Sequence, residues 1–486
     1  MRTSPRSLRE AWVALAGLSA VFLFEMLDNS ILTVALPTIG RELHASATAL
    51  QWATGAYAVV FGGLMLAFGA VADRFGRRRV MLVGLALLAV ASLATAFVTT
   101  TGELIAVRVA MGVAAAMTTP GSAALAFRLF DEDGLRVRAF NIISTVGIAG
   151  LAVGPTVGGF ALAIAPWQAL LLVNVPIAVL AMAGVWSGVA PDDASGLNTD
   201  PVDVAGAVLG TTAIVAALVA PTLFVDDGAG AWAPWAVTTV AVLAAVLFVL
   251  RERTARHPLV DLKLVAHPLV ASGLAFKAAT GLAVAGVGYL ISLQMQLDWG
   301  WSPGLASLGM LPQVIVLIAG GALLNPLVKR VGLERAGWLS AAAVVAGLAV
   351  YALLGGHGYL WVAVALVLMA GGLRVVGVVA GTNVLRGLPE SRTSIGVALT
   401  DTASQVSGGA GLAVAGTILA AMFTGPLTAT PWNAGQTAEF HDVVTTAGLT
   451  LTVVAAALVG WGILRGAGGR GSASPSRPVP SHTGSA

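Results

Sequence analysis

The sequence predicts an all-α membrane protein with 14 transmembrane helices, arranged as two six-helix halves with a two-helix insertion between them. Of its 486 residues, 57% are hydrophobic and only 10% are charged, and the mean hydropathy is +0.89. Apolar runs of about 20 residues, the length that crosses a bilayer as a helix, recur along the whole chain. The 59 glycines suit helices that approach one another closely in lipid.

Each apolar run is expected to form one membrane-spanning helix. The runs cover residues 11–37, 49–71, 79–98, 102–126, 137–163, 168–190, 202–223, 233–250, 268–293, 303–326, 336–354, 359–384, 394–423 and 444–464. The predicted domains are an N-terminal segment 1–10, a first half 11–190, an inserted pair with flanking loops 191–267, a second half 268–465 and a disordered, Gly/Ser/Pro-rich tail 466–486.

The basic residues predict which side of the membrane each loop faces. An even number of spans puts both termini on one side, and 22 of the 26 Lys and Arg residues lie on the termini and on the even-numbered loops. The odd-numbered loops carry Arg41 alone. Both termini are therefore expected to be cytoplasmic, in a cell membrane. The loop 191–203 departs from this pattern because it holds four aspartates and no base, but acids contribute little to the rule.

Composition also excludes several function classes. The absence of cysteine rules out disulfides and thiol chemistry. The formal net charge of +3 is small, and the Lys and Arg residues are not clustered in a way that suggests nucleic-acid binding. No His-Glu-x-x-His string is present, and no predicted span contains a histidine. We therefore expect no enzymatic activity, no catalytic residues, no metal and no cofactor.

The first span holds two carboxylates inside an otherwise apolar run. Glu25, Asp28 and Asn29 stand at i, i+3 and i+4, so they share one helical face, and Thr33 lies a turn further on. A charge near the bilayer centre costs about 2.5 to 3.5 kcal/mol, so each acid needs a cavity, a partner or a proton. The alternative is a salt bridge that only holds helices together.

Three bases and three acids fall in the interior of the predicted spans, away from the end residues, and this match suggests mutual compensation. They are Arg108, Lys277, Arg374, Glu25, Asp28 and Asp401. Their distances from the span ends predict two charge centres. Asp28 and Arg108 share a level in the outer half of the first six spans, whereas Lys277, Arg374 and Asp401 share a level nearer the inside in the second six. Asp401 also begins a polar stripe at helical spacing, with Ser404, Gln405 and Gly408.

A short loop joins the second and third spans. Its sequence runs from Gly69 through Asp73, Arg74, Gly76 and Arg77 to the following arginines. The glycines let the turn close tightly, Asp73 can cap a helix or pair with a base, and the arginines anchor the cytoplasmic side. This string resembles the signature loop of the major facilitator superfamily of transporters.

Further motifs resemble the fourteen-span drug:proton antiporter branch of that superfamily. Leu27 to Pro37 is similar to its first-helix motif, with Ser30 where the branch usually has Thr and Thr33 where it often has Asn. Arg108 with Gly112 resembles the proton-coupling arginine motif. Smaller matches are Gln51, Trp52, Tyr57, Gln296, Gly300, Ser302, Pro303, Leu388, Pro389 and Glu390. The resemblance extends over about residues 12 to 460.

The fifth span carries a glycine motif that resembles the one associated with exporters. Gly150, Gly154 and Gly158 are spaced by four, so they form one bare helix face, and Gly159 follows. Pro155 is expected to bend this helix. A close and bendable contact suits a gate with two states, although static packing is the alternative.

A degenerate internal repeat supports the division into two halves. The string from Gly321 to Gly332 is similar to the Gly69 loop, with Asn325 in the position of Asp73. Related halves of this kind enclose a central site, and Lys277 then stands near the position equivalent to Asp28.

The resemblance implies a monomeric, proton-coupled antiporter that exports drugs, antibiotics or similar amphipathic small molecules by alternating access. Asp28 and Arg108 would couple protons, and Glu25 would be a cavity residue with neither a partner nor a place in the motif. The predicted substrate cavity comprises Glu25, Asn29, Tyr57, Lys277, Gln296, Arg374, Asp401 and Gln405. A proton-coupled carrier of a specific metabolite is the alternative, because the fold does not fix the function.

Overall fold

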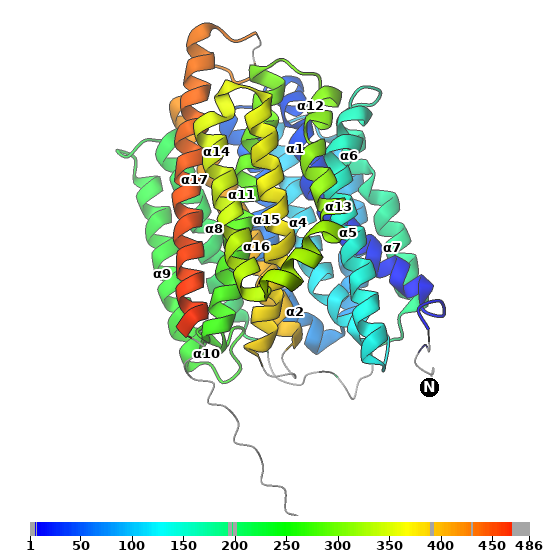
Figure 1. Ribbon diagram of the computed structural model, residues 1–486. Coiled ribbons are helices and arrows are strands. Elements are labelled where there is room, and N and C mark those ends of the chain that lie inside the picture. Colours follow the sequence, from blue (N-terminus) through cyan, green and yellow to red (C-terminus); the bar gives the residue numbers. More distant parts are fainter. Residues whose placement is uncertain are drawn as a thin grey trace, which may run out of the picture.

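The computed structural model describes Pro5, residues 7–192, Leu197 and residues 202–388, 393–428 and 431–468. This part of the chain is a bundle of helices without a strand (Figure 1). In the described part of the chain, thirteen helices are long and apolar enough to cross a membrane, and the count is fourteen if the pair Pro303–Gly309 and Leu311–Gly320, bent by 43°, is one span. The predicted fold class is therefore confirmed. Most of the predicted tail, from residue 469 on, lies outside the described residues.

The helices follow the predicted spans in order. The first half contains α1 (Trp12–Glu42), α2 (Ala47–Phe75), α3 (Arg77–Ala94), η1 (Thr95–Phe97), α4 (Thr101–Arg128), α5 (Asp133–Ala161), α6 (Gln168–Leu172) and α7 (Asn174–Gly188). The inserted part contains α8 (Val204–Asp226), α9 (Trp232–Thr254) and α10 (Leu262–Val265). The second half contains α11 (Pro268–Leu293), the π-helical turn η3 (Gln294–Asp298), α12 (Pro303–Gly309), α13 (Leu311–Val331), α14 (Leu333–Leu354), η4 (Gly355–His357), α15 (Tyr359–Arg386), α16 (Thr393–Met422) and α17 (Ala434–Gly468).

The first helix does not end at Pro37 as predicted but continues to Glu42. A proline inside a helix has no N–H for the carbonyl four residues earlier, which here belongs to Thr33. The structure supplies another donor, because the hydroxyl of Ser292 on α11 donates to the Thr33 carbonyl at 2.6 Å. The continuous helix is thus compatible with the proline, and the released carbonyl becomes a contact between the two halves.

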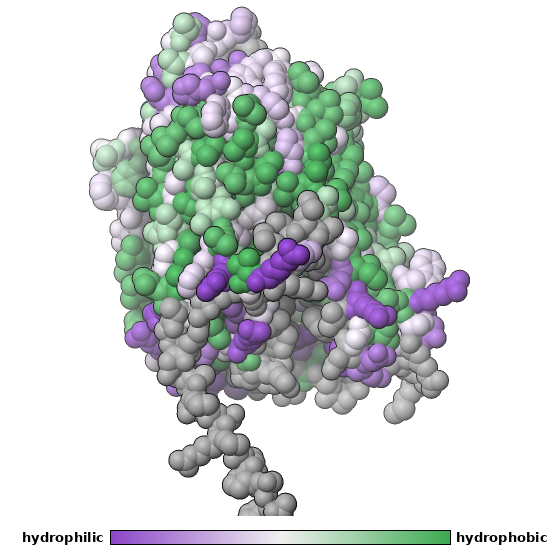
Figure 2. All heavy atoms as spheres, viewed as in Figure 1, coloured by the Kyte–Doolittle hydropathy of each residue, from purple (hydrophilic) through white to green (hydrophobic). Residues whose placement is uncertain are grey.

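The surface of the bundle matches a membrane protein. On the face shown in Figure 2, a broad apolar band crosses the middle of the molecule, and polar residues gather towards its two ends. The helix α9 exposes large hydrophobic side chains such as Val242, Leu243 and Leu247, as expected of a helix that faces lipid. We call the end that carries the start of α1 and the end of α17 the lower face, and the opposite end the upper face (Figure 1). The chain is a multi-pass membrane protein.

The acidic loop that departs from the charge rule caps two helices at the lower face. Asp192 accepts hydrogen bonds from the backbone N–H groups of Arg78 and Arg79 at the start of α3, at 3.1 and 3.2 Å. Asp203 caps α8 and pairs with Arg251 at 3.1 Å. Burial alone would raise the pKa of Asp203, but hydrogen bonds from Arg251 and the α8 backbone outweigh it and hold the pKa below its usual range. These aspartates serve helix N-termini, where negative charge is favourable.

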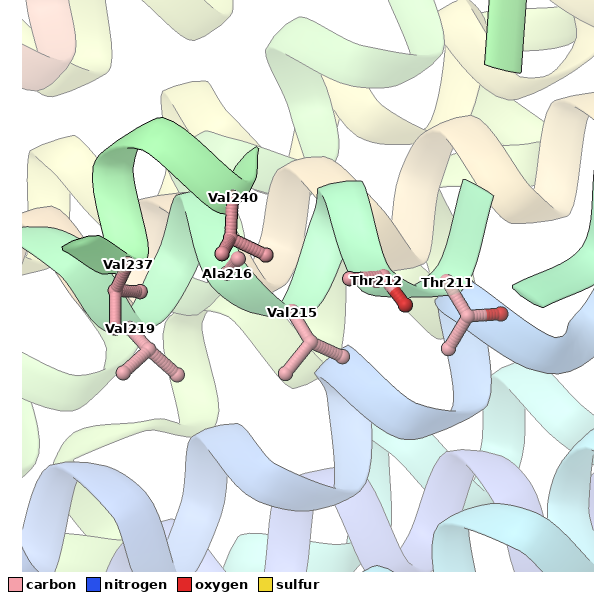
Figure 3. A pocket seen from close by; sticks show the side chains of 7 residues that line it. All are labelled: Thr211, Thr212, Val215, Ala216, Val219, Val237 and Val240. Atoms are coloured by element: carbon pink, nitrogen blue, oxygen red, sulfur yellow. The ribbon is translucent and has the colours of Figure 1, made fainter. Parts of the chain in front are cut away.

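The inserted pair lies against both halves. Thr211 on α8 donates to the Gly63 carbonyl on α2 at 2.8 Å, and α8 also packs on α16. Gln51 on α2 donates to Thr222 of α8 at 3.3 Å. A cavity of about 370 Å³ between α8 and α9 is lined by apolar side chains and the two threonines Thr211 and Thr212 (Figure 3). It contains no acid or base, so it lacks the chemistry expected of the transport site.

Candidate functional site

Asp28 on α1 and Arg108 on α4 form a buried ion pair. The Arg108 Nη1 atom lies 2.6 Å from Asp28 Oδ2, and the two side chains are 1% and 0% exposed. The pairing predicted from their common depth is confirmed. Because removal of one partner would leave a buried charge uncompensated, the pair binds α1 firmly to α4 as long as both residues are charged.

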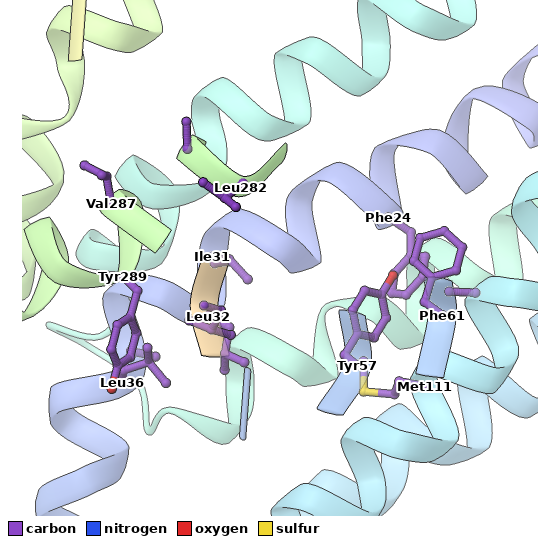
Figure 4. Close-up of a cluster of buried hydrophobic side chains, with 14 of the residues drawn as sticks. Phe24, Ile31, Leu32, Leu36, Tyr57, Phe61, Met111, Leu282, Val287 and Tyr289 are labelled. Atoms are coloured by element: carbon purple, nitrogen blue, oxygen red, sulfur yellow. The ribbon is translucent and has the colours of Figure 1, made fainter. Parts of the chain in front are cut away.

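Other polar atoms of Asp28 and Arg108 form hydrogen bonds with neighbouring helices. The Asn174 amide on α7 donates to Asp28 Oδ1 at 2.9 Å, and Arg108 Nε donates to the Ala53 carbonyl on α2 at 3.2 Å. The guanidinium also lies over the ring of Tyr57, 4.5 Å from its centre. Tyr57, a predicted cavity residue, is fully buried against Phe24 and other apolar side chains (Figure 4). Its role here is to pack against the ion pair.

Glu25 lies nearby on α1, and the prediction that it lacks a partner is wrong. Its Oε2 atom accepts a hydrogen bond from the Thr119 hydroxyl on α4 at 3.0 Å. Its Oε1 atom accepts another from the Gln405 amide on α16 at 3.2 Å. Since Gln405 belongs to the second half, this buried carboxylate connects the two halves.

Two charges of the second half interact electrostatically with Glu25. Lys277 on α11 acts on both Glu25 and Asp401, and Asp401 on α16 acts on Glu25. No ion pair within 4 Å joins these charges among the described residues. Arg374, the third member of the predicted group, makes no ion pair or hydrogen bond in the described part of the chain. We call Glu25, Thr119, Gln405, Asp401 and Lys277 the interface cluster.

Two predicted features lie where the structure gives no side-chain description. Asn29 belongs to α1, but its side chain lies outside the described residues, as do Pro389 and Glu390 of the Leu388 motif.

The loop after α2 closes at the lower face with a glycine. Gly76 adopts a φ of +103°, a conformation that favours glycine, and α3 starts at the next residue. Arg77 Nε lies 2.7 Å from Asp73 Oδ1, so Asp73 pairs with a base and does not cap a helix. Gly69 and Arg74 belong to the last turns of α2.

The equivalent loop of the second half closes in the same way. Gly332, with a φ of +87°, separates α13 from α14. Each half therefore reverses direction at the lower face through one glycine in the left-handed region. This correspondence supports the internal repeat, although the side chain of Asn325 lies outside the described residues.

The glycine motif of α5 contacts two different helices. Gly154 and Gly158 face α1 in the same half, where an added Cβ atom would collide with Ser30 and Ile31. Gly159 faces α12 in the second half, where an added Cβ would lie 2.6 Å from the Ser307 Cβ atom. Pro155 lies inside α5 between these contacts. Among the described glycines of the motif, Gly159 is the one that faces the other half, while Leu151 and Ala152 of the same motif pack with Val314 and Leu317 of α13.

The halves also contact each other near the upper face. Gln296 in η3 donates to the Val34 carbonyl on α1 at 2.9 Å, one residue from the Ser292 contact with Thr33. Tyr289 of α11 and Leu36 of α1 belong to one buried hydrophobic cluster and overlap in the view of Figure 4. The structure thus places Gln296, a predicted cavity residue, in an upper contact between the halves.

A search for charged residues misses three polar side chains of this site. Asn174, Thr119 and Ser292 are uncharged, yet each lies at most 2% exposed and donates to a group on another helix. Asn174 is the only amide in the apolar run from residue 169 to 185, and that isolation is the signal that could have found it.

The comparisons with known proteins agree with this architecture. The family model described as Major Facilitator Superfamily matches residues 18–412. The crystal structure of an auto-inhibited POT family peptide transporter superposes with a TM-score of 0.64 and 14% identity, covering 97% of this chain and 99% of that chain. At this identity the likeness shows the fold alone.

Curated relatives cover most of the chain. The multidrug efflux pump LfrA of Mycolicibacterium smegmatis is 31% identical over 90% of this chain and 87% of its own length. The methyl viologen resistance protein SmvA of Salmonella typhimurium is 28% identical over 85% and 83%. The puromycin resistance protein pur8 of Streptomyces alboniger is 33% identical over 64% and 62%.

Proposed function

The chain belongs to the Major Facilitator Superfamily, and from that premise we propose that it is a proton-coupled antiporter that exports drugs, antibiotics or similar amphipathic small molecules. The relatives named for efflux and resistance support this direction of transport. The observation that carries the proposal is the fully buried Asp28–Arg108 pair beside a contact between the halves. Proton coupling requires a group there whose charge changes on protonation, because that change must shift the equilibrium between the two conformations.

The ion pair of Asp28 with Arg108 accounts for proton uptake in the proposed transport cycle. While both residues are charged, Arg108 and Asp28 attract each other and hold α1 against α4. When substrate or a rearrangement weakens that contact, the carboxylate takes a proton from the upper, external side, and the pair loses its charge attraction. Each proton that enters is driven by about 2.3 kcal/mol per 100 mV of membrane potential, which is enough to bias a balanced two-state equilibrium.

We assign the substrate to the space between the halves, next to the interface cluster. Glu25 and Gln405 come from opposite halves, so a molecule that competes for their hydrogen bond acts on both halves together. The cluster holds two acids and one base, and it can therefore contact either a cationic or a neutral polar group. The contact at Gly159 then forms the upper gate, and the loops closed by Gly76 and Gly332 form the lower gate. The two gates open in alternation.

Glu25→Gln is expected to change the range of exported compounds or the proton stoichiometry more than it changes folding. The glutamine amide retains an oxygen that accepts from Thr119 or Gln405, so the hydrogen bonds survive in part while the charge is lost. Export of cations should fall relative to export of neutral compounds, as measured by resistance and efflux assays at matched protein levels. Equal loss for all compounds, with reduced expression, would contradict a role in selectivity.

The topology and domain boundaries complete the proposal. The start of α1 and the end of α17 lie at the lower face, and we propose from the arginines of the Gly69 loop that this face is cytoplasmic, as are both termini. We further propose a monomer with residues 11–190 and 268–465 as the two moving halves and residues 191–267 as the inserted part.

Export assays test this function directly. Cells with and without the protein are loaded with a panel of cationic dyes and with acidic or neutral antibiotics, and retention is followed with and without a protonophore. We expect lower retention of some compounds in cells that contain the protein, and loss of the difference with the protonophore. Accumulation of a compound in energised cells would indicate an importer, and insensitivity to the protonophore would contradict proton coupling.

A further inference from the structure

We propose that Asn174 is a positioning residue for the proton site, donating a hydrogen bond to ionised Asp28 and accepting one from protonated Asp28. This inference rests on the proposed function, because it assumes that Asp28 gains and loses a proton. It adds α7, a helix without any acid or base, to the proton site.

The geometry gives each oxygen of Asp28 its own partner. Arg108 Nη1 contacts Oδ2 at 2.6 Å, and Asn174 Nδ2 contacts Oδ1 at 2.9 Å. Asn174 stands at the first position of α7 and is fully buried. Pro176, two residues later, has no N–H for the Leu172 carbonyl, which accounts for the interruption between α6 and α7 at Val173. The side-chain amide of Asn174 therefore lies at the start of α7, where it contacts Asp28 on α1.

The oxygen of the same side-chain amide makes no hydrogen bond in the described structure. Asn174 Oδ1 is buried and has no hydrogen-bond partner in the described structure. A buried carbonyl oxygen without a partner is costly, and natural proteins seldom retain one without a reason. Rotation of the amide about its last side-chain bond exchanges the two atoms, so that Oδ1 faces Asp28 in place of Nδ2. After this rotation Asn174 can accept the O–H that forms when the Asp28 carboxylate takes a proton from hydronium.

Few other charged groups act on this site. Arg108 comes from α4, Tyr57 from α2 and Glu25 from the preceding turn of α1. The helices α5 and α7, which also pack on α1, carry no acid or base between residues 139 and 161 or between residues 174 and 188. Among the neutral side chains of the described site, Asn174 is the one that donates a hydrogen bond directly to Asp28, so it is placed to respond to both protonation states.

The test compares variants that separate shape from hydrogen bonding. Asn174→Asp keeps the shape of the side chain but cannot donate to ionised Asp28, and it shares a proton with it instead. Asn174→Leu can neither donate nor accept, whereas Asn174→Ser can do both. The readout is the infrared carbonyl band of protonated carboxyl groups in the purified full-length protein, followed as pH is lowered, with the component that Asp28→Asn removes assigned to Asp28.

We expect the Asp28 component in Asn174→Asp and Asn174→Leu to rise at a pH about one unit higher than in the wild type, because the hydrogen bond lost from the charged carboxylate is stronger than the one lost from the neutral carboxyl group. Asn174→Ser should stay near the wild-type midpoint. Wild-type midpoints in both Asn174→Asp and Asn174→Leu would overturn the role of Asn174. If one of them fails to fold, the other still decides, and an unchanged band in Asp28→Asn would instead refute Asp28 as the proton site of the proposed function.

Discussion

Asp28→Asn is expected to reduce uphill export to background while substrate exchange without a gradient persists. Asparagine cannot take up a proton, so transport loses its driving force, but its side-chain oxygen can still accept from Arg108. Loss of one partner of a buried ion pair lowers the free energy of unfolding by about 3–5 kcal/mol when the other charge is left without a partner. The remaining hydrogen bond should offset part of that loss. The measurement compares energised efflux with counterflow in proteoliposomes.

Asp28→Glu is the matched control, because it keeps the carboxylate and lengthens the side chain by one methylene. It should retain coupling at a reduced rate. Normal uphill export by Asp28→Asn would show that another group carries the proton, and loss of both efflux and counterflow would point to a damaged fold.

Gly159→Val is expected to abolish transport by preventing the halves from meeting at the upper face. A Cβ atom at this position would collide with the Pro303 carbonyl and with Ser307 of α12, and a backbone carbonyl cannot rotate away as the end of a long side chain can. The clash lies between the halves, so each half should still fold. Transport should fall to background at a normal expression level.

The absence of native cysteine allows the state of this contact to be measured. Ser292→Cys introduces a single thiol beside the Thr33 carbonyl, and a membrane-impermeant maleimide should label it faster when Gly159→Val is also present. Gly102→Val is the control, because nothing lies within 4 Å of a Cβ atom added there. Equal labelling and equal transport in the two glycine variants would contradict the gating role of Gly159.

The sequence predicts the helices and the first charge centre because both depend on quantities that are local in the chain. Apolar length locates each span, and residue count gives the depth at which Asp28 and Arg108 meet. The extension of α1 beyond Pro37 was missed because it depends on Ser292, whose hydroxyl occupies the carbonyl that the proline leaves free. A local reading of residues around position 37 contains no information about α11.

The partners of Glu25 could not be predicted for a related reason. Gln405 lies 380 residues away, and the hydrogen bond depends on the rotation and register of α16 against α1. Equal depth brings charged residues to the same level but does not say which side of a helix faces which neighbour. For that reason Arg374 shares the predicted level of Lys277 and Asp401 and yet makes no ion pair or hydrogen bond in the described structure.

Proton release on substrate binding tests the central claim that Asp28, paired with Arg108, exchanges a proton for substrate. The purified protein is mixed in weakly buffered solution with a compound that the export assays identify, and the pH change is recorded for the wild type and for Asp28→Asn. The account predicts release of about one proton per bound molecule by the wild type and none by Asp28→Asn, although the variant still binds the compound. Equal proton release by the two proteins would contradict it.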